Sequence, residues 1–283
     1  MEIIRYPSSD ELLRSAGEWL QQSEAENNLI LGVANRSSSF ETKDGPPAYW
    51  AAICDCGEIV GCAFRTPPSP IGLTKLPLES IPHLISDISE FHSRAPGVNG
   101  PVSEAEQFAK LWSERYSMSW RVNMRLRIHR LGQVIFPVDA AQGKLRQPLA
   151  TEDSLIRKWV EELAEEAGLA DDPVQAANRL IESGNVGIWD WNGPRCIVAG
   201  ARETPSGVCI NAVYTPVEHR RSGYATIAVA TFSQEQLDSG KEFCCLYTDV
   251  DNPTSNSIYA KIGYEYIRDD VHIEFDRGVE ISE

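Results

Sequence analysis

The sequence predicts two mixed α/β domains in tandem, each a mainly antiparallel twisted sheet flanked by helices. Three observations predict this fold: a length of 283 residues, a weak internal repeat, and alternating strand and helix patterns in the second half. The length is close to that of two ordinary domains. An apolar fraction of 42% and a charged fraction of 24% are typical of globular proteins, so each half has enough apolar sequence for a core.

The internal repeat begins with a short strand and an amphipathic helix in each half. Residues Ile4–Arg14 match Leu145–Arg157 in this pattern, with a Ser, Thr or Asp at the start of each helix. The match resumes at Ile53–Ala63 and Ile188–Ala201, which both read as hairpins with a polar turn. Because the matches occur in the same order, the repeat favours two related domains over chance similarity between strands.

The repeat places the domain boundary near Ala141–Gln142, so we expect domains at residues 1–141 and 142–283. After its hairpin the first half contains a segment rich in Pro and Gly, Pro96–Pro101, which is typical of a turn or a loop. The next segment, Ser103–Tyr116, has the pattern of a helix.

The net charge of −15 argues against a nucleic-acid partner, because that affinity depends on Lys and Arg neutralising phosphates. The seven cysteines lack the CxxC spacing of a zinc site, so we expect no metal. Unpaired cysteines in apolar runs are typical of a reduced, cytoplasmic compartment. No apolar run is long enough for a signal peptide or a membrane span, so we expect no membrane partner.

The second half predicts two strands, each followed by a helix. Val208–Tyr214 is rich in β-branched and aromatic residues, and Glu218–Ala225 opens a helix that ends near Ser239. Phe243–Asp249 is the second strand, and the helix after it ends at Gly263. Polar side chains near the start of that helix, such as Thr254 or Ser255, are suitable caps.

The turn at the start of the first of these helices has the properties of a phosphate-binding loop. Gly223 allows the backbone to approach a ligand, and Ala225 is too small to clash with it. The first turn of a helix offers backbone N–H groups to anionic oxygens. Arg220 and Arg221 add positive charge at the same point. Taken alone, this pattern also fits an ordinary solvated turn.

Two motifs together resemble the GCN5-related N-acetyltransferase family. The family signature Arg/Gln-x-x-Gly-x-Gly/Ala is similar to Arg220, Gly223 and Ala225. Its second motif has an Asn before a helix, a Tyr within it and a closing Gly-Phe or Gly-Tyr, which here are Asn252, Tyr259 and Gly263-Tyr264. The resemblance covers residues 142–283. It implies a tandem acetyltransferase protein whose second domain uses acetyl-coenzyme A as its acyl donor.

The resemblance also implies the residues that bind acetyl-coenzyme A. They belong to the pantetheine-pairing strand, the pyrophosphate loop and the second helix: Ala212, Val213, Tyr214, Arg220, Arg221, Ser222, Gly223, Tyr224, Ala225, Asn252, Ser255, Asn256 and Tyr259.

Tyr259 is the candidate general acid by this resemblance. A phenol with a pKa of about 10 stays protonated at neutral pH and can give a proton to the departing thiolate. The alternative is that Tyr259 is a half-buried packing residue. For the base that deprotonates the amine, Asp249 and Glu203 are candidates, although each also fits a surface carboxylate. In this family the base varies in position or is replaced by water.

The first half carries no comparable loop. Where the repeat would place a pyrophosphate loop, Leu76–Pro82 lacks Arg and Gly and contains Glu79, so we expect this domain to be degenerate. Its basic strand Arg121–Arg130 alternates charged and apolar residues. That pattern indicates a half-exposed strand, with contact to an acidic substrate as the alternative.

The expected function is transfer of an acetyl group from acetyl-coenzyme A to a primary amine of a small molecule or peptide, by direct attack on the thioester. The alternative is a non-catalytic protein that senses acyl-coenzyme A or a small amine. The expected assembly is a monomer or a homodimer.

Overall fold

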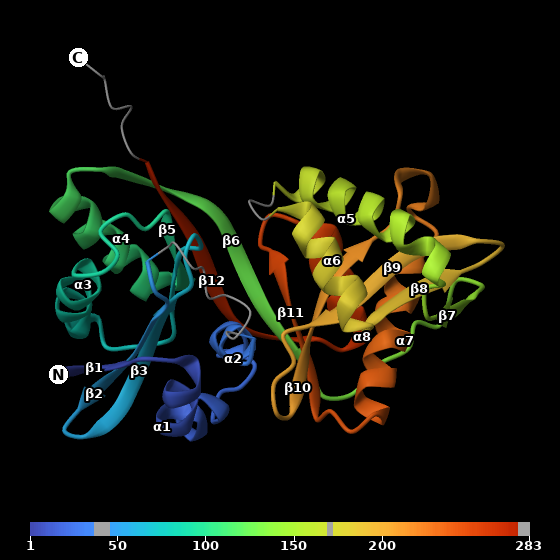
Figure 1. The fold of residues 1–283 in the computed structure, drawn as a ribbon. Coiled ribbons are helices and arrows are strands. Elements are labelled where there is room, and N and C mark those ends of the chain that lie inside the picture. The colour runs from blue at the N-terminus through green and yellow to red at the C-terminus, as the bar shows by residue number, and fades with distance from the viewer. Residues whose placement is uncertain (37–45, 169–171, 277–283) are drawn as a thin grey trace, which may run out of the picture. The chain divides into compact units, whose positions relative to one another are not determined.

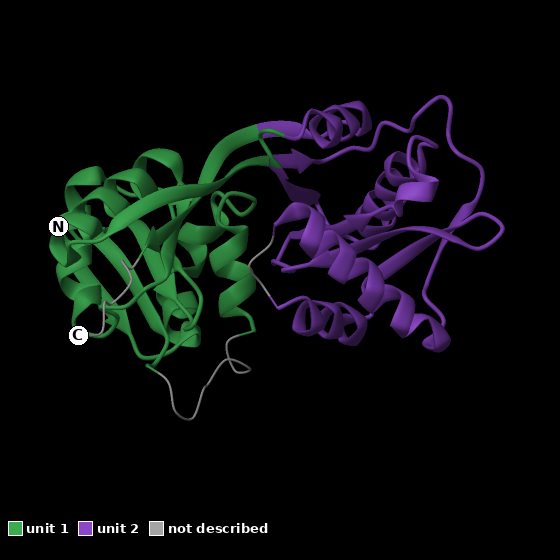
Figure 2. Cartoon of the chain, turned by 90° about the horizontal axis from the view of Figure 1, so that it is seen from above, with its two compact units in different colours: residues 1–128, 249–251, 267–283 green, residues 129–248, 252–266 purple. Residues whose placement is uncertain are grey.

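The computed structural model describes residues 1–36, 46–168 and 172–276. The chain forms two compact units, shown in different colours in Figure 2. Unit 1 contains residues 1–128, residues 249–251 and the described residues from 267 onward. Unit 2 contains residues 129–248 and 252–266. Each is a mixed α/β unit, as the sequence predicts (Figure 1).

Unit 1 has a strand, two helices, a hairpin and then alternating strands and helices. In chain order its elements are β1 (Glu2–Tyr6), α1 (Ser9–Gln21), α2 (Asn28–Ala34), β2 (Tyr49–Asp55), β3 (Glu58–Arg65), β4 (Ile71–Leu73), α3 (Ile81–Ser89), β5 (Gly97–Pro101), α4 (Val102–Tyr116) and most of β6 (Ser119–Leu131).

Unit 2 repeats this order of elements. They are β7 (Lys144–Arg146), α5 (Asp153–Ala167), α6 (Pro173–Ser183), β8 (Val186–Asp190), β9 (Pro194–Ala201), β10 (Gly207–Tyr214), α7 (Tyr224–Asp238), β11 (Phe243–Asp249), α8 (Pro253–Ile262) and the start of β12 (Glu265–Asp276). None of the helices in the described ranges is long and apolar enough to cross a membrane.

The two hairpins of the repeat both turn through two consecutive residues with positive φ. Cys56 and Gly57 have φ of 50° and 87°, and Asn192 and Gly193 have φ of 53° and 111°. Two positive φ values in a row are typical of the tight hairpin turn that matches the twist of antiparallel strands. The internal repeat seen in the sequence therefore extends to backbone conformation.

The last strand of the chain completes the sheet of unit 1. From Ile267 onward β12 belongs to unit 1, where Asp270–Glu274 pair antiparallel with Gly97–Pro101 of β5. The strand order there is β1-β2-β3-β4-β5-β12-β6. Phe275 stacks on Trp112 of α4 with ring centroids 6.0 Å apart. Residues from the two ends of the sequence therefore share one core.

The expected domain division at Ala141–Gln142 concerns the sequence repeat and remains a prediction. The compact units have different bounds, because β6 enters unit 2 only at His129 and most of β12 lies in unit 1.

The segment Pro96–Pro101 is a strand, so the prediction of a turn or loop there was wrong. Gly97–Pro101 is β5, which pairs with β12 on one side and with β4 on the other. A Cβ at Gly97 would overlap the carbonyl oxygen of Ile273. Glycine is therefore required by the close approach of two strands, which a single sequence cannot distinguish from a turn.

In each unit, helices pack on both faces of the sheet. In unit 1, α1 and α2 pack with Trp50 and Phe64 on one face, and α3 and α4 pack with Ile71 and Val98 on the other. In unit 2, α5 and α6 cover the face that includes Ala212, and α7 and α8 cover the opposite face. Alternating residues of the central strands therefore face different helices.

Candidate active site

The predicted site begins at a bulge in β10. Asn211 pairs with Ala199 of β9, but the next register pair is Tyr214 with Ile197, so β10 has one extra residue here. Ala212 adopts a left-handed φ of 46°, and its N–H donates to the side-chain oxygen of Asn211 at 2.9 Å. A bulge of this kind bends a strand and interrupts its ladder.

Beyond the bulge, β10 and its parallel neighbour β11 stop pairing. Their register runs from Gly207 with Phe243 to Ile210 with Leu246, although β10 continues to Tyr214 and β11 to Asp249. The edge of residues 211–214 that would face β11 therefore has no register partner in the described part of the chain. In open α/β sheets, ligands bind at the carboxyl ends of strands where neighbours part in this way. Ala212, Val213 and Tyr214, which the resemblance assigns to the pantetheine strand, lie on this edge.

The loop after β10 ends at a left-handed glycine. Gly223 has φ of 77° and caps the N-terminus of α7, and its carbonyl accepts the hydrogen bond of Ile227 N–H. A Cβ built on Gly223 would have only the Cβ of Ala141 within 4 Å, at 3.9 Å. The space above the helix start is therefore open, and the first N–H groups of α7 have no acceptor within the helix. This is the geometry that binds phosphate oxygens.

Arg220 is held by residues of its own unit. Its Nη2 donates to the two carboxylate oxygens of Glu166 at 2.7 and 2.6 Å, and its Nε donates to Thr215 O at 2.9 Å. The hydrogen bond to Glu166 is the largest cause that raises the pKa of Arg220. The guanidinium therefore fixes the loop to α5. Arg221, which is exposed and has φ of 60°, is the arginine of this loop that remains available to a phosphate.

The start of α8 is fixed by asparagines. Asn252 caps the helix, because its side-chain oxygen accepts from Ser255 N–H at 3.1 Å and Pro253 fills the first helical position. The suggestion that Thr254 or Ser255 caps this helix was wrong for that reason. Asn256 donates from Nδ2 to Asn252 O at 2.9 Å. Asn252, Ser255 and Asn256 therefore form one connected group at the carboxyl end of β11.

Thr248 is a site residue that sequence reasoning missed. Its hydroxyl donates to the side-chain oxygen of Asn256 at 2.6 Å and lies 3.5 Å from Nε2 of His129. The motif contains Asn256, but nothing in its spacing indicates the threonine eight residues earlier or a histidine from β6. Thr248 therefore orients Asn256 through a contact that is visible only in the fold.

Tyr259 points its ring into the core below α7. It packs against that core and meets the ring of Tyr264 edge-on, with centroids 5.8 Å apart. Burial is the largest cause that raises the pKa of Tyr259, followed by the Cys196 and Cys209 thiols. The phenol therefore stays protonated at neutral pH, as a proton donor must. None of the described residues accepts a hydrogen bond from its hydroxyl within the hydrogen-bond distance.

The two candidate bases lie at different places. Glu203 is exposed, pairs with Lys241 at 3.2 Å and precedes β10, so it lies at the end of that strand opposite to the phosphate-binding loop. The structure therefore does not bring Glu203 to the site. Asp249 is the last residue of β11, and its Oδ1 accepts from Asp251 N–H at 2.9 Å.

The corresponding segment of unit 1 is a short helical turn without glycine or arginine. A turn of 3-10 helix, Leu78–Ser80, leads into α3, where Ile81 is fully buried and Pro82 occupies the first turn. The positive charges of the basic strand β6 are paired with carboxylates of unit 1. Arg121, Arg125 and Arg127 form ion pairs with Glu274, Glu106 and Asp269.

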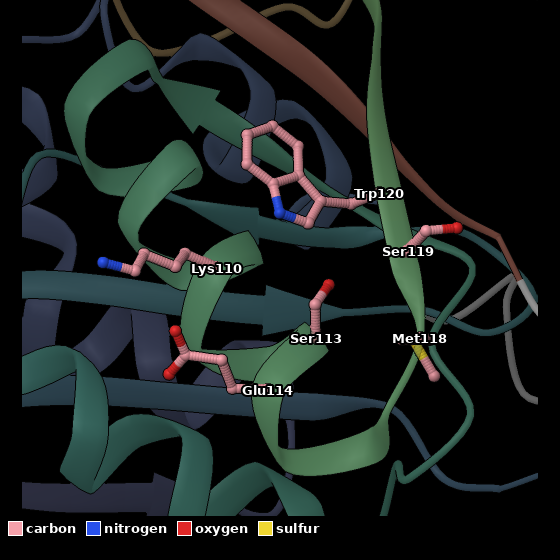
Figure 3. A pocket seen from close by; sticks show the side chains of 6 residues that line it. All are labelled: Lys110, Ser113, Glu114, Met118, Ser119 and Trp120. Atoms are coloured by element: carbon pink, nitrogen blue, oxygen red, sulfur yellow. The ribbon is translucent and has the colours of Figure 1, made fainter.

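A pocket of about 430 Å³ in unit 1 is separate from the predicted residues. Figure 3 shows it between α4 and the start of β6, with the Trp120 ring on the strand side. Its lining is Lys110, Ser113, Glu114, Met118, Ser119 and Trp120. None of the residues expected to bind acetyl-coenzyme A contributes to it.

Comparisons with known proteins give one family match and several solved structures of the same fold. Residues 185–273 match the family described as FR47-like protein. No curated protein matches the chain. A crystal structure of a Drosophila protein matches with a TM-score of 0.70 at 10% identity, covering 97% of this chain and 98% of that one.

Two further solved structures are similar over nearly the whole chain. A GCN5-related N-acetyltransferase from Sphaerobacter thermophilus has a TM-score of 0.62 at 15% identity, covering 96% of this chain and 95% of that one. A tandem GNAT protein from the clavulanic acid biosynthesis pathway has a TM-score of 0.52 at 9% identity, covering 97% and 98%. Over nearly its whole length the chain therefore has the fold of these GCN5-related N-acetyltransferase structures, and residues 185–273 match the FR47-like family.

Proposed function

We propose that unit 2 binds acetyl-coenzyme A and transfers its acetyl group to a primary amine of a small molecule or peptide. The proposal rests mainly on one observation: β10 and β11 stop pairing beside the open N-terminus of α7. Proteins of this fold include acetyltransferases, which supports acyl transfer from an acyl-coenzyme A donor.

The residues present fit the donor at both of its ends. The bare backbone at Gly223 and the first turn of α7 suit the pyrophosphate, with Arg221 as the nearby cation. The unpaired edge at Ala212–Tyr214 suits the amide groups of pantetheine, because an exposed strand edge binds an extended chain through backbone hydrogen bonds. Asn252, Ser255 and Asn256 line the same end of the sheet. The site requires no metal.

The reaction is direct transfer from sulfur to nitrogen. The neutral amine attacks the thioester carbonyl, the carbon–nitrogen bond forms, and the carbon–sulfur bond breaks. Tyr259 gives its proton to the departing thiolate, and Asp249 or water takes the proton that the amine loses. Backbone N–H groups of the β10 bulge stabilise the charge that develops on the carbonyl oxygen.

Free thiol release from acetyl-coenzyme A with a panel of amines tests this proposal. The proposal predicts turnover with at least one primary amine and no turnover after Tyr259→Phe and Gly223→Val are combined. The alternative, a sensor of acyl-coenzyme A, predicts tight binding by calorimetry with no thiol release on any amine.

A further inference from the structure

Two buried cysteines face each other at the point where β10 and β11 part. Cys209 and Cys245 are partners in the parallel register, one residue before that register ends, and both are fully buried. Their neighbours Val208, Cys244 and Leu246 belong to the core against α7, so the two thiols lie on the opposite face of the sheet. Their position is fixed by strand pairing and not by flexible loops.

The separation of these cysteines suits a covalent bond. Neighbouring strands lie about 4.7–4.9 Å apart, and disulfides bridge Cα atoms about 4.4–6.8 Å apart. An in-register pair therefore meets the distance requirement without movement of the backbone.

A contact with a cation sets this pair apart from the other cysteines. Arg202 donates from Nη2 to the sulfur of Cys209 at 2.9 Å, and its guanidinium lies 5.0 Å from the Tyr247 ring centroid. The hydrogen bond from Cys245, followed by the charge of Arg202, lowers the pKa of Cys209. The hydrogen bond to Cys209 and burial raise the pKa of Cys245. The Arg202 contact and the neighbouring thiol therefore both favour the thiolate form of Cys209.

The other buried thiols lack such a partner and behave as core residues. Burial raises the pKa of Cys62, Cys196 and Cys244. A thiol held protonated in this way is a poor nucleophile, whereas a thiolate next to a resolving thiol is typical of an oxidation-sensitive site.

We propose that Cys209 and Cys245 form a peroxide-sensitive dithiol that hydrogen peroxide converts to an intramolecular disulfide. In the first step the Cys209 thiolate attacks one peroxide oxygen, which forms a sulfenic acid and releases hydroxide. In the second step the Cys245 sulfur attacks the sulfenic sulfur, and its proton and the departing hydroxide leave as water. The two thiols lose two electrons to one peroxide. Arg202, which contacts Cys209, is itself partly exposed, so the thiolate lies one side chain from solvent.

The disulfide would link β10 to β11 just before the point where the two strands stop pairing. It would also remove the sulfur charge that pairs with the partly buried guanidinium of Arg202. Neither step involves acetyl-coenzyme A, so the inference is independent of the proposed function.

Peptide mass mapping after peroxide treatment tests the proposal. All variants carry Cys56→Ser, because Cys56 is the exposed cysteine and would form bonds between molecules. We expect a crosslink between the Cys209 and Cys245 peptides that lacks two hydrogen atoms and disappears with a dithiol reductant. Cys244→Ser is the matched control, since it removes the adjacent thiol on the other face and should keep the crosslink.

Two further variants test the roles of the second thiol and of the cation. Cys245→Ser should abolish the crosslink and leave a sulfenic acid on Cys209 that dimedone traps. Arg202→Gln should slow the oxidation by about tenfold or more, because it removes the charge that favours the thiolate. An unmodified Cys209 in the parent chain, or a crosslink that persists in Cys245→Ser through Cys244, would overturn the proposal.

Discussion

The guanidinium of Arg220 binds both carboxylate oxygens of Glu166, at 2.7 and 2.6 Å, and so ties the phosphate-binding loop to α5. The first arginine of the motif is therefore a brace for the loop. Its neighbour Arg221 is exposed and has no such partner among the described residues. The structure thus separates two roles that the sequence motif combines.

This separation predicts different effects for two substitutions. Arg221→Ala should weaken coenzyme A binding by about tenfold, the loss expected for one hydrogen bond between charged groups. Glu166→Gln should weaken it less, because the surface ion pair that braces the loop is worth only about 0–1 kcal/mol. Calorimetric titration at low and high salt checks both, since the contribution of an exposed Arg221 should shrink with salt. Equal losses in the two variants would contradict the assignment.

Gly223→Val should lower the affinity for coenzyme A. The loss of affinity should be larger than the loss of folding stability can explain. Any Cβ at φ of 77° costs about 1–2 kcal/mol of backbone strain, and here it would also point into the open space at the start of α7. Gly240→Val is the matched control, since Gly240 follows the other end of α7 with φ of 105° and no atom within 4 Å of its built Cβ. Thermal unfolding should give similar losses for both variants. Unchanged affinity in Gly223→Val would show that the pyrophosphate binds elsewhere.

Tyr259→Phe should slow acetyl transfer about a hundredfold while leaving the affinity for acetyl-coenzyme A nearly unchanged. The substitution keeps the ring that packs on Tyr264 and removes only the hydroxyl. A proton donor to the leaving thiolate acts as the carbon–sulfur bond breaks, so its loss falls on kcat. Pre-steady-state transfer to a responsive amine measures that step directly. A chemical step as fast as in the parent chain would make Tyr259 a packing residue.

Asp249 and Glu203 form a matched pair of carboxylates. Asp249→Asn should lower kcat if the carboxylate at the end of β11 accepts the amine's proton, whereas Glu203→Gln should leave transfer unchanged. The reason is position, because Glu203 pairs with Lys241 before β10 begins. Steady-state kinetics of both variants with the same amine decides between Asp249 and water. Full activity in Asp249→Asn would assign the role to water.

The locally determined parts of the site were predictable from the sequence. β11 runs from Phe243 to Asp249 as predicted, and Gly263 ends α8 with φ of 103°. Strand composition, capping residues and glycines act over a few residues, so a single sequence reveals them. The spacing of the two motifs then indicated a superfamily whose fold the similar solved structures share with this chain.

Contacts between distant segments were not predictable. The partner of Arg220 is 54 positions away in α5, and the partner of Cys209 depends on the register of two strands. The pairing of β12 with β5 joins the end of the chain to the first unit, although both strands have ordinary local patterns. Such contacts depend on which strands become neighbours, which local propensity does not determine.

A crystal structure of the full chain grown with acetyl-coenzyme A would show directly where the donor binds. We expect one donor molecule per chain, bound to unit 2. Its pyrophosphate should accept hydrogen bonds from the first N–H groups of α7, and its pantetheine should lie along Ala212–Tyr214, with its sulfur near Tyr259. A donor bound in unit 1, or one that leaves the edge of β10 beyond Ile210 uncovered, would contradict the account.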